Sequence, residues 1–473
     1  MMRASIAAEK AGIPAVSIVS TPFAAQARAF ARGLGLMAPA LAEYPGEPRK
    51  DSAEQLHDKT VNQLLPRILE GLVKRSDAEA QSGNAAEPGQ RDIVFRGNLQ
   101  QVQDFFHEQL WSDGLPVIPP TVDAVEKFVA FTDRSPDEVI GVCAPEYREA
   151  TIWNVAVNGV MAGCRPEYMP ALIAIVECIV DPLFRLEDAS STPGWEPLII
   201  INGPIITQLD FNSGTGAMRV GRQANTSIGR FLRLYMRNIS GLRIPPGETD
   251  QPGIGYTFNV VLAENEDAVA EMGWEPFSVG RGFERGESVV TVQSVTSITQ
   301  SVYTPATDAR TQVAVISEII GQNFAYQSHV GALNKAWHPL LVMSPSAAKA
   351  IADEGWSKQD IKQYLYENTK VRADYIERHA RYTAHADFNF KDLVERGMLP
   401  PEYHESDDPA RLIRVFVKPE WIGIVVAGAP GRPQSRGYRQ NGKQGAPVSR
   451  KIVLPKNWTR LLAPRRQPPG RCL

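Results

Sequence analysis

The sequence predicts an α/β protein made of a small, partial α/β domain at the N-terminus and a large domain of mixed α/β or α+β type. Three observations lead to this prediction. Helix-like and strand-like segments follow one another along most of the 473 residues, and 43% of the residues are hydrophobic, which is enough for a sizeable core. A polar segment without any large apolar residue separates residues 1–75 from the rest.

The first domain, residues 1–75, contains the helix-like segment "RASIAAEKAG", a Gly-Ile-Pro break and the β-branched run "AVSIVST". The helix-like segments "PFAAQARAFARGLG" and "SAEQLHDKTVNQLLPRILEGLVKR" follow. We expect half of an α/β unit here, without the parallel partner of its strand. The polar segment "SDAEAQSGNAAEPGQRD", residues 76–92, is then predicted to be a linker.

The second domain is expected to cover residues 93–430. Helical spacing is found in "DAVEKFVAFTD", "EATIWNVAVNGVMAG", "RPEYMPALIAIVECIV", "NTSIGRFLRLYMRNI" and "SKQDIKQYLYENTK". Strand-like runs lie between these segments: "PLIIING", "YTFNVVLAEN", "SVVTVQSV", "HPLLVMSP" and "RVFVKPEWIGIVVAG". Residues 431–473 are basic and rich in Pro, Gly and Arg, which predicts a poorly ordered tail.

The composition excludes several classes of partner and cofactor. A net charge of -3 gives no reason to expect nucleic acid or an anionic membrane as a partner. The longest apolar run, "ALIAIVECIV", is about half as long as a membrane-spanning helix. The four cysteines form no CxxC pair, which favours a reducing, cytoplasmic location. The seven histidines are scattered, so we expect no metal, and no motif indicates a cofactor.

The most specific candidate for chemistry is Cys164, in "VNGVMAGCRPEYMPAL". Gly163 suits the left-handed residue that ends one helix, and Pro166 suits the first turn of the next. A thiolate at Cys164 would then be stabilised by the free N–H groups of that helix end and by Arg165. The alternative is that Cys164 is simply a small buried hydrophobic residue.

A second candidate is the segment "INGPIITQLDFNSGTGAMRVGRQANTSIGRFLRL". Its glycine-rich loop and a helix start capped by Asn225 or Thr226 could bind an anionic substrate. The candidate binding residues are Asn202, Asn212, Ser213, Gly214, Thr215, Gly216, Arg219, Arg222, Asn225 and Arg165. The motif is neither a P-loop nor GxGxxG, and the arginines could equally belong to a solvated helix face.

A third candidate is "HEQLWSDGLPVIPPT". His107, Glu108 and Asp113 are its acid/base candidates. Asp113 and Gly114 predict a turn, and the prolines after it predict a rigid extended segment. The alternative role of this segment is to brace the fold.

Two parts of the chain resemble a known family. "EKAGIPAVSIVSTPFAAQARAFARGLGL" resembles the domain of UGSC-type selenoproteins and their cysteine homologues, in which a Cys or selenocysteine motif precedes the helix. That motif would lie upstream of Arg3. "SDGLPVIPPT", "MAGCRPEY", "IINGPI", "NSGTGAM" and "NTSIGRFLRL" resemble the larger companion domain, so the resemblance covers residues 1–430.

These observations lead to three hypotheses about function. The first is a thiol- or selenol-dependent oxidoreductase or carbon–heteroatom bond-cleaving enzyme that acts on a small anionic substrate, with Cys164 as nucleophile and His107 or Asp113 moving protons. The second is a non-catalytic substrate-binding or scaffold subunit that serves a selenoprotein or thiol-redox partner. The third is a cofactor-free hydrolase or lyase. In each case we expect a homo-oligomer.

Overall fold

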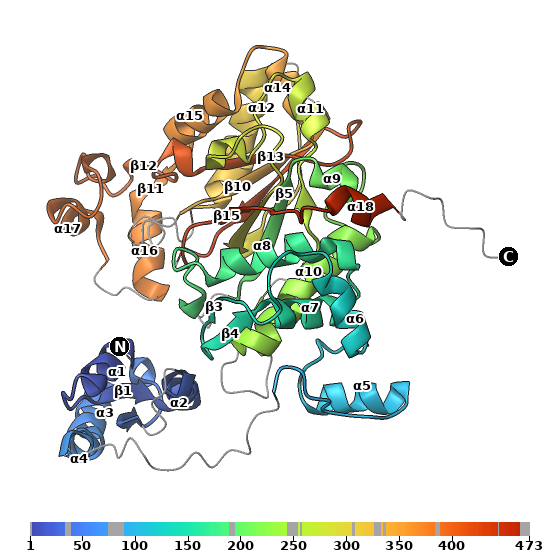
Figure 1. Cartoon of the computed structure of the whole chain (residues 1–473). Coiled ribbons are helices and arrows are strands. Elements are labelled where there is room, and N and C mark those ends of the chain that lie inside the picture. The colour runs from blue at the N-terminus through green and yellow to red at the C-terminus, as the bar shows by residue number, and fades with distance from the viewer. Residues whose placement is uncertain are drawn as a thin grey trace.

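The computed structural model (Figure 1) describes most of the chain. The described residues are 2–33, 39–73, 89–188, 194–243, 254–255, 258–304, 308–325, 333, 337–383, 388–442 and 444–463.

The N-terminal part is a small α/β unit. Its elements are α1 (Met2–Lys10), β1 (Ser17–Ser20), α2 (Ala24–Gly33), β2 (Leu41–Tyr44), α3 (Ala53–Asp58) and α4 (Leu65–Val73). The two strands pair in parallel, with Ser17 opposite Leu41. The partner strand that we expected to be missing is therefore present. Its sequence, "LAEY", is too short for alternation of apolar residues to reveal it.

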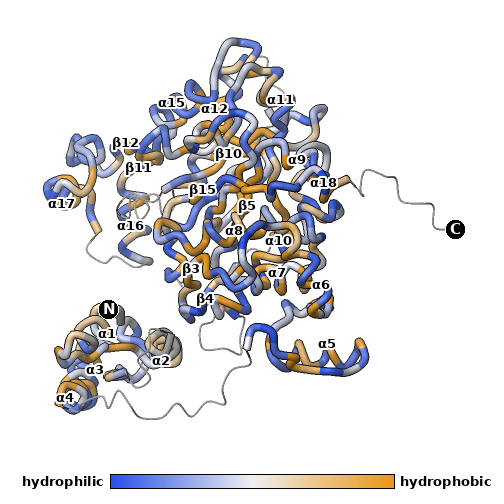
Figure 2. Tube along the Cα trace, viewed as in Figure 1, coloured by the Kyte–Doolittle hydropathy of each residue, from blue (hydrophilic) through white to orange (hydrophobic). Residues whose placement is uncertain are grey.

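The first half of the large domain is mainly helical before its first long strand. Its elements are α5 (Leu99–Glu108), α6 (Val122–Val129), β3 (Val139–Cys143), β4 (Arg148–Thr151), α7 (Ile152–Met161), α8 (Met169–Val180), β5 (Glu196–Asn202), α9 (Ile205–Gln208), α10 (Gln223–Tyr235), β6 (Leu262–Ala263), α11 (Glu266–Glu271) and β7 (Val289–Val295). Helix α8 is almost entirely buried, and Figure 2 shows that the interior around α8 and β5 is strongly hydrophobic.

The second half alternates short strands with helices. Its elements are β8 (Ser297–Ile298), β9 (Val302–Tyr303), α12 (Ala309–Ile316), β10 (Leu340–Met343), α14 (Pro345–Ala352), α15 (Lys358–Asn368), β11 (Lys370–Arg372), α16 (Ala373–Thr383), α17 (Phe390–Glu395), β12 (Leu412–Arg414), β13 (Gly423–Val426), β14 (Gln434–Arg439), β15 (Val448–Lys451) and α18 (Trp458–Leu462).

Two mixed sheets form the centre of the large domain. One has the strand order β15-β7-β5-β6, and the other has β13-β10-β14-β8 with β9 also paired to β14. Parallel pairs, β5 with β6 and β10 with β13, occur beside antiparallel ones. The prediction of a mixed α/β or α+β fold is confirmed.

The alternation of side chains along the strands shows how the layers are arranged. On β5, Ile199 and Ile201 belong to the core shared with α7, α8 and α10, whereas Leu198 and Ile200 belong to a second core that includes Leu340 of β10. Leu341 and Met343 of β10 point the other way, into the core with α12, α14 and α15. The order of layers is therefore helices, sheet, sheet, helices.

The basic C-terminal segment is more ordered than the predicted tail. Within residues 431–463, β14 is an internal strand paired with β10, and β15 pairs with β7. Residues 464–473 lie outside the described residues. Strands pair through backbone hydrogen bonds, which form regardless of the charge on the side chains. A basic composition therefore did not exclude strands in this segment.

Most of the predicted linker, residues 76–88, lies outside the described residues. Its last part belongs to the large domain: the backbone carbonyl of Gln90 accepts a hydrogen bond from Trp153 Nε1 at 2.9 Å. Among the described helices, none combines the length and the apolar composition needed to cross a membrane.

Candidate functional site

The turn that carries Cys164 has the predicted backbone. Gly163 has φ +78, and its N–H donates to the carbonyl of Val160 at 2.9 Å. The Cys164 N–H donates to the carbonyl of Gly159 at 3.0 Å. These two bonds are the Schellman motif that ends α7. A short 3-10 helix then begins at Pro166 and leads into α8.

The pKa of the Cys164 thiol is raised, whereas the sequence predicted a stabilised thiolate. Its own N–H is used by the end of α7, whose negative dipole end disfavours a thiolate. Burial raises the pKa of the Cys164 thiol to about 12, although a hydrogen bond from Ser227 and the charge of Arg230 act in the opposite direction. The thiol is therefore protonated near neutral pH. This finding favours the alternative that Cys164 is a packed residue.

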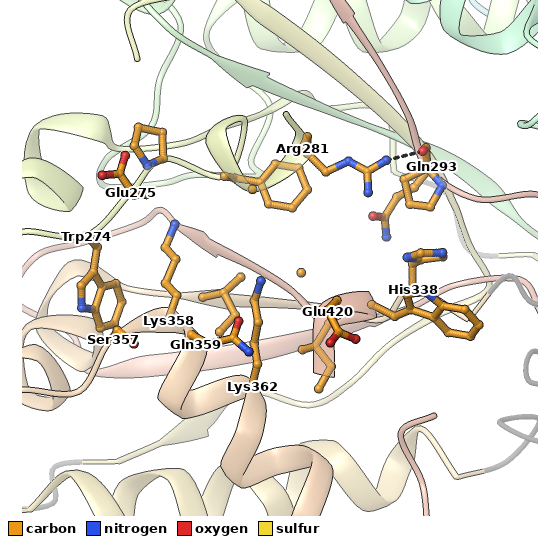
Figure 3. Close-up of a pocket in the computed structure, with 18 of the residues that line it drawn as sticks. Trp274, Glu275, Arg281, Gln293, His338, Ser357, Lys358, Gln359, Lys362 and Glu420 are labelled. Atoms are coloured by element: carbon orange, nitrogen blue, oxygen red, sulfur yellow. Dashed lines mark hydrogen bonds between the residues drawn. The ribbon is translucent and has the colours of Figure 1, made fainter. Parts of the chain in front are cut away.

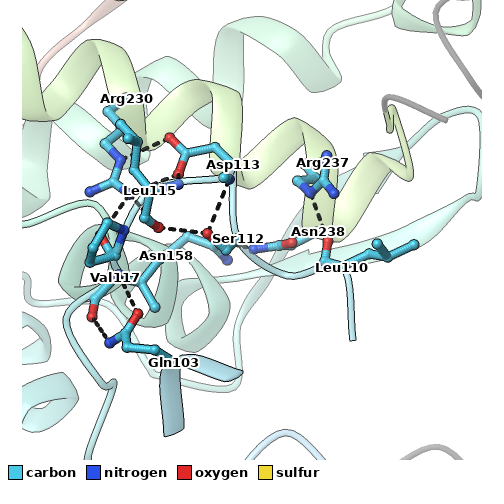
Figure 4. A network of polar contacts seen from close by, with 12 residues as sticks. Gln103, Leu110, Ser112, Asp113, Leu115, Val117, Asn158, Arg230, Arg237 and Asn238 are labelled. Carbon is cyan, nitrogen blue, oxygen red and sulfur yellow. Dashed lines mark hydrogen bonds and ion pairs between the residues drawn. The ribbon is translucent and has the colours of Figure 1, made fainter. Parts of the chain in front are cut away.

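Asp113 and Arg230 form the centre of the neighbouring network (Figure 4). Arg230 Nε donates to Asp113 Oδ2 at 2.9 Å and Arg230 Nη2 to Oδ1 at 2.8 Å, which is a bidentate ion pair. Burial raises the pKa of Asp113, but the hydrogen bonds and charge of Arg230 outweigh it, so the pKa is lowered. A carboxylate that stays ionised in such a pair is a poor general base at neutral pH.

The segment around Asp113 acts as a brace between helices. Arg230 Nη2 also donates to the Pro116 carbonyl at 2.9 Å, and Gln103 of α5 exchanges hydrogen bonds with the backbone of Val117. His107 is exposed on α5. Within the described part of the chain, no hydrogen bond joins the His107 ring to Cys164 or Asp113. The geometry therefore fits the bracing role, and it does not assemble His107, Asp113 and Cys164 into one acid/base group.

The glycine-rich loop is folded upon itself. Asn212 Oδ1 accepts from the Gly214 N–H at 3.1 Å, and Asn212 Nδ2 donates to the Thr215 carbonyl at 3.0 Å. The Ser213 carbonyl accepts from the Gly428 N–H at 2.9 Å, and the Gly216 carbonyl accepts from the Arg219 N–H at 3.0 Å. Several polar groups expected to hold a substrate are therefore used within the protein.

The start of α10 also differs from the prediction. The N-cap is Arg222, not Asn225 or Thr226. Asn225 cannot cap the helix because its side chain bridges the backbones of Asn212 and Val261, with Nδ2 donating to the Val261 carbonyl at 2.8 Å.

The predicted arginines are exposed and mostly paired. Arg222 forms an ion pair with Asp210 at 2.5 Å, and Arg165 Nε donates to Gln223 Oε1 at 2.6 Å. Gln223 Nε2 in turn donates to the Gly163 carbonyl at 3.2 Å. The structure thus brings the Cys164 turn next to the start of α10, while Arg219 is exposed. These arginines fit the alternative of a solvated surface.

Asn202 lies elsewhere, in a buried network centred on Glu264. Asn202 Nδ2 donates to Glu264 Oε2 at 2.7 Å. The Glu264 carboxylate is fully buried and also accepts from the Phe277 N–H at 2.6 Å and from Lys358 Nζ at 2.8 Å. Asn202 is therefore a structural residue whose network ends at Lys358, on the wall of a cavity.

That cavity, of about 290 Å³, is the best candidate site of the large domain (Figure 3). Its apolar lining includes Trp274, Phe277, Trp421, Ile422 and Ile424. Its polar lining includes Arg281, Gln293, His338, Lys358, Lys362 and the rim carboxylates Glu275 and Glu420. We call it the Arg281 cavity. Its volume is near the lower end of ligand pockets, which suits a small molecule.

Arg281 offers a ligand a positive charge that no carboxylate of the described residues neutralises. Lys358 is neutralised by Glu264, and Glu275 at the rim pairs with Arg285. Arg281 donates to the Pro447 carbonyl at 2.6 Å and to Ser449 Oγ at 3.3 Å, but it pairs with no carboxylate among the described residues. Burial lowers the pKa of Arg281, as expected for a cation that lacks a counter-ion.

Two further polar groups of the Arg281 cavity are available for recognition. Burial and the charge of Arg281 lower the pKa of His338 to about 4, so its imidazole is neutral at physiological pH. Gln293 on β7 is only 2% exposed, and its side-chain nitrogen has no hydrogen-bond partner in the part of the chain that the structure describes. A buried amide without a partner is costly, so a ligand acceptor would stabilise it.

A second cavity of about 250 Å³ lacks such free charge. Its arginine, Arg134, is already paired with Glu138 at 2.7 Å and Glu177 at 2.5 Å. Across the described ranges, no group of three or more His, Cys, Asp or Glu side chains could hold a metal ion.

Sequence reasoning missed the Arg281 cavity because its polar residues come from separate segments. Arg281 ends a short 3-10 helix, Gln293 lies on β7 and His338 precedes β10. The one local signal was the spacing of Lys358 and Lys362, which places two cations on one face of the predicted helix "SKQDIKQYLYENTK".

Comparison with known families supports the N-terminal assignment. The model of the UGSC family matches residues 1–74, so this part of the chain is a UGSC-like domain. Neither the curated proteins nor the solved structures gave a match to the chain.

Proposed function

We propose that this protein serves a thiol- or selenol-dependent oxidoreductase or carbon–heteroatom bond-cleaving reaction, in which the large domain binds the small anionic substrate in the Arg281 cavity. The observation that carries this proposal is a half-buried arginine, Arg281, that pairs with no carboxylate of the described residues. Beside it lies the buried side chain of Gln293, whose amide nitrogen has no hydrogen-bond partner there either. An anionic substrate would supply both missing partners through charge-assisted hydrogen bonds.

The likeness of residues 1–74 to the UGSC family supports the redox part of the proposal. The resemblance implies a Cys or selenocysteine motif as the reactive group, which a UGSC-type partner or domain would supply here. The raised pKa of Cys164 disfavours that residue as the nucleophile. The substrate-binding role is therefore the hypothesis that the geometry supports best.

The free thiols of Cys143, Cys164 and Cys178 support a reducing compartment, and we place the protein in the cytoplasm as part of this proposal.

Binding of small anions to the purified chain tests the proposal. Titration calorimetry with phosphate and with pyruvate should show binding that Arg281→Gln weakens by about tenfold to a hundredfold, since a hydrogen bond to a charged group is worth about 1.5–3 kcal/mol. Arg222→Gln is the matched control, because Arg222 is an exposed arginine of the glycine-rich region. Equal losses in both variants, or a loss only in Arg222→Gln, would contradict the proposed site.

A further inference from the structure

The two lysines of the Arg281 cavity are placed by one helix. A capping box of Ser357 and Asp360 fixes the start of α15, and Lys358 and Lys362 follow one turn apart on the same face. In Figure 3 both side chains extend from α15 into the cavity, and Arg281 approaches from the opposite wall.

The two amines have different surroundings. Lys358 Nζ lies 2.8 Å from Glu264, whose carboxylate is fully buried, so this ammonium is held as a fixed cation. Lys362 has neither a hydrogen bond nor an ion pair within the residues that the structure describes, although it is half-buried. Its amine is thus the one lysine group of the cavity that a ligand can use.

The surroundings also favour the neutral form of the Lys362 amine. Burial lowers its pKa, and the neighbouring charges of Lys358 and Arg281 lower it further, while Glu420 at the rim opposes them. His338 is neutral, and Glu275 is engaged with Arg285. A desolvated lysine beside a second cation is the arrangement that makes an amine nucleophilic near neutral pH.

We propose that Lys362 forms an imine with the carbonyl carbon of a small 2-oxo acid whose carboxylate binds Arg281. This inference rests on the proposed function, and it names the substrate class of the same cavity. The neutral Nζ attacks the carbonyl carbon and a C–N bond forms; the resulting carbinolamine then takes up one proton from solvent and loses one water to give the protonated imine. Glu420 is the lining carboxylate able to take up and return the proton.

The shape of the cavity favours a 2-oxo acid over a simple inorganic anion. A phosphate ion would use the cations but would leave the apolar wall of Trp274, Phe277 and Trp421 without a partner. A carbon skeleton can pack on that wall, while the carboxylate pairs with Arg281 and the amide of Gln293.

Borohydride trapping tests this inference. The full chain is incubated with pyruvate and sodium borohydride, and the reduced adduct is measured by intact mass and mapped by peptide sequencing. We expect one adduct, on Lys362, that falls by about tenfold or more in Lys362→Met and in the presence of excess phosphate. Lys349→Met is the matched control, because Lys349 lies on the exposed face of α14, and it should leave the adduct unchanged.

The outcomes separate this inference from the proposed function. Pyruvate binding that depends on Arg281, without an adduct on Lys362, overturns the imine and leaves the anion site standing. Absence of both binding and adduct overturns both proposals. An adduct that persists in Lys362→Met overturns the assignment of the reactive amine to Lys362. Thermal unfolding of each variant serves as the control that it is folded.

Discussion

The reactivity of Cys164 towards iodoacetamide gives the sharpest test of the site. Burial raises the pKa of this thiol from its ordinary value of 9.0 to about 12, so at neutral pH its thiolate fraction is about a thousandfold lower than that of a free thiol. A more basic thiolate is more nucleophilic, with a Brønsted slope of about 0.4–0.5, which recovers about a factor of 15 to 30. The net expectation is alkylation about 30- to 60-fold slower than for a free cysteine, before any steric protection.

The measurement is the rate of Cys164 labelling across pH, with each modified cysteine assigned by peptide mass. A short cysteine peptide in the same tube gives the reference rate, and labelling in urea should raise the Cys164 rate to that reference. Labelling of Cys164 in the native protein near pH 7 at or above the reference rate would refute the reasoning. It would restore Cys164 as a catalytic thiolate in the first of our functional hypotheses.

Two further predictions concern stability, measured by urea denaturation. Asp113→Asn should lower the free energy of unfolding by about 2–3 kcal/mol at pH 7, since it leaves Arg230, 15% exposed, without its counter-charge. The folded-state pKa of Asp113 is lowered, so this difference is present above the unfolded pKa of about 3.8 and should be lost as pH falls through the folded value. The exposed Asp210→Asn control should cost under about 1 kcal/mol, and similar losses in both variants would contradict the role of burial. Gly203→Ala should lower the free energy of unfolding by roughly 2–4 kcal/mol, because Gly203 has φ +89 and a Cβ would lie 2.2 Å from the Glu287 carbonyl oxygen. A loss below about 1 kcal/mol would show that the backbone of this turn relaxes to accept the Cβ.

The order of breaks and elements was largely predictable. Gly163 and Pro166 mark the end of α7 and the turn that leads into α8 through their own φ preferences, and these act on the local chain alone. The stripe of apolar residues on α10 likewise predicted a helix, and the structure places Ile228 and Phe231 in its core.

The charge on a site residue was not predictable in the same way. The turn at Gly163 was correctly predicted, and a 3-10 helix begins at Pro166 before α8. The pKa of the Cys164 thiol is nevertheless set by burial and by the end of the preceding helix. Asp113 and Arg230 are 117 residues apart, so their pairing has no local signature. The basic segment that we expected to be a tail forms β14 and β15, because main-chain pairing does not depend on side-chain composition.

The sequence by itself therefore determined the class of fold, the likeness of residues 1–74 to the UGSC family, and the turn at Gly163 that ends α7. These features depend on residues close together in the chain, whose backbone preferences and apolar spacing are visible in one dimension. Only the tertiary structure decided which polar groups share a cavity and which are neutralised. Arg281, Gln293 and Lys362 meet because two sheets and a helix converge on the same cavity. This packing keeps water and counter-charges away from the three side chains, and that exclusion determines their protonation and their capacity to bind a ligand.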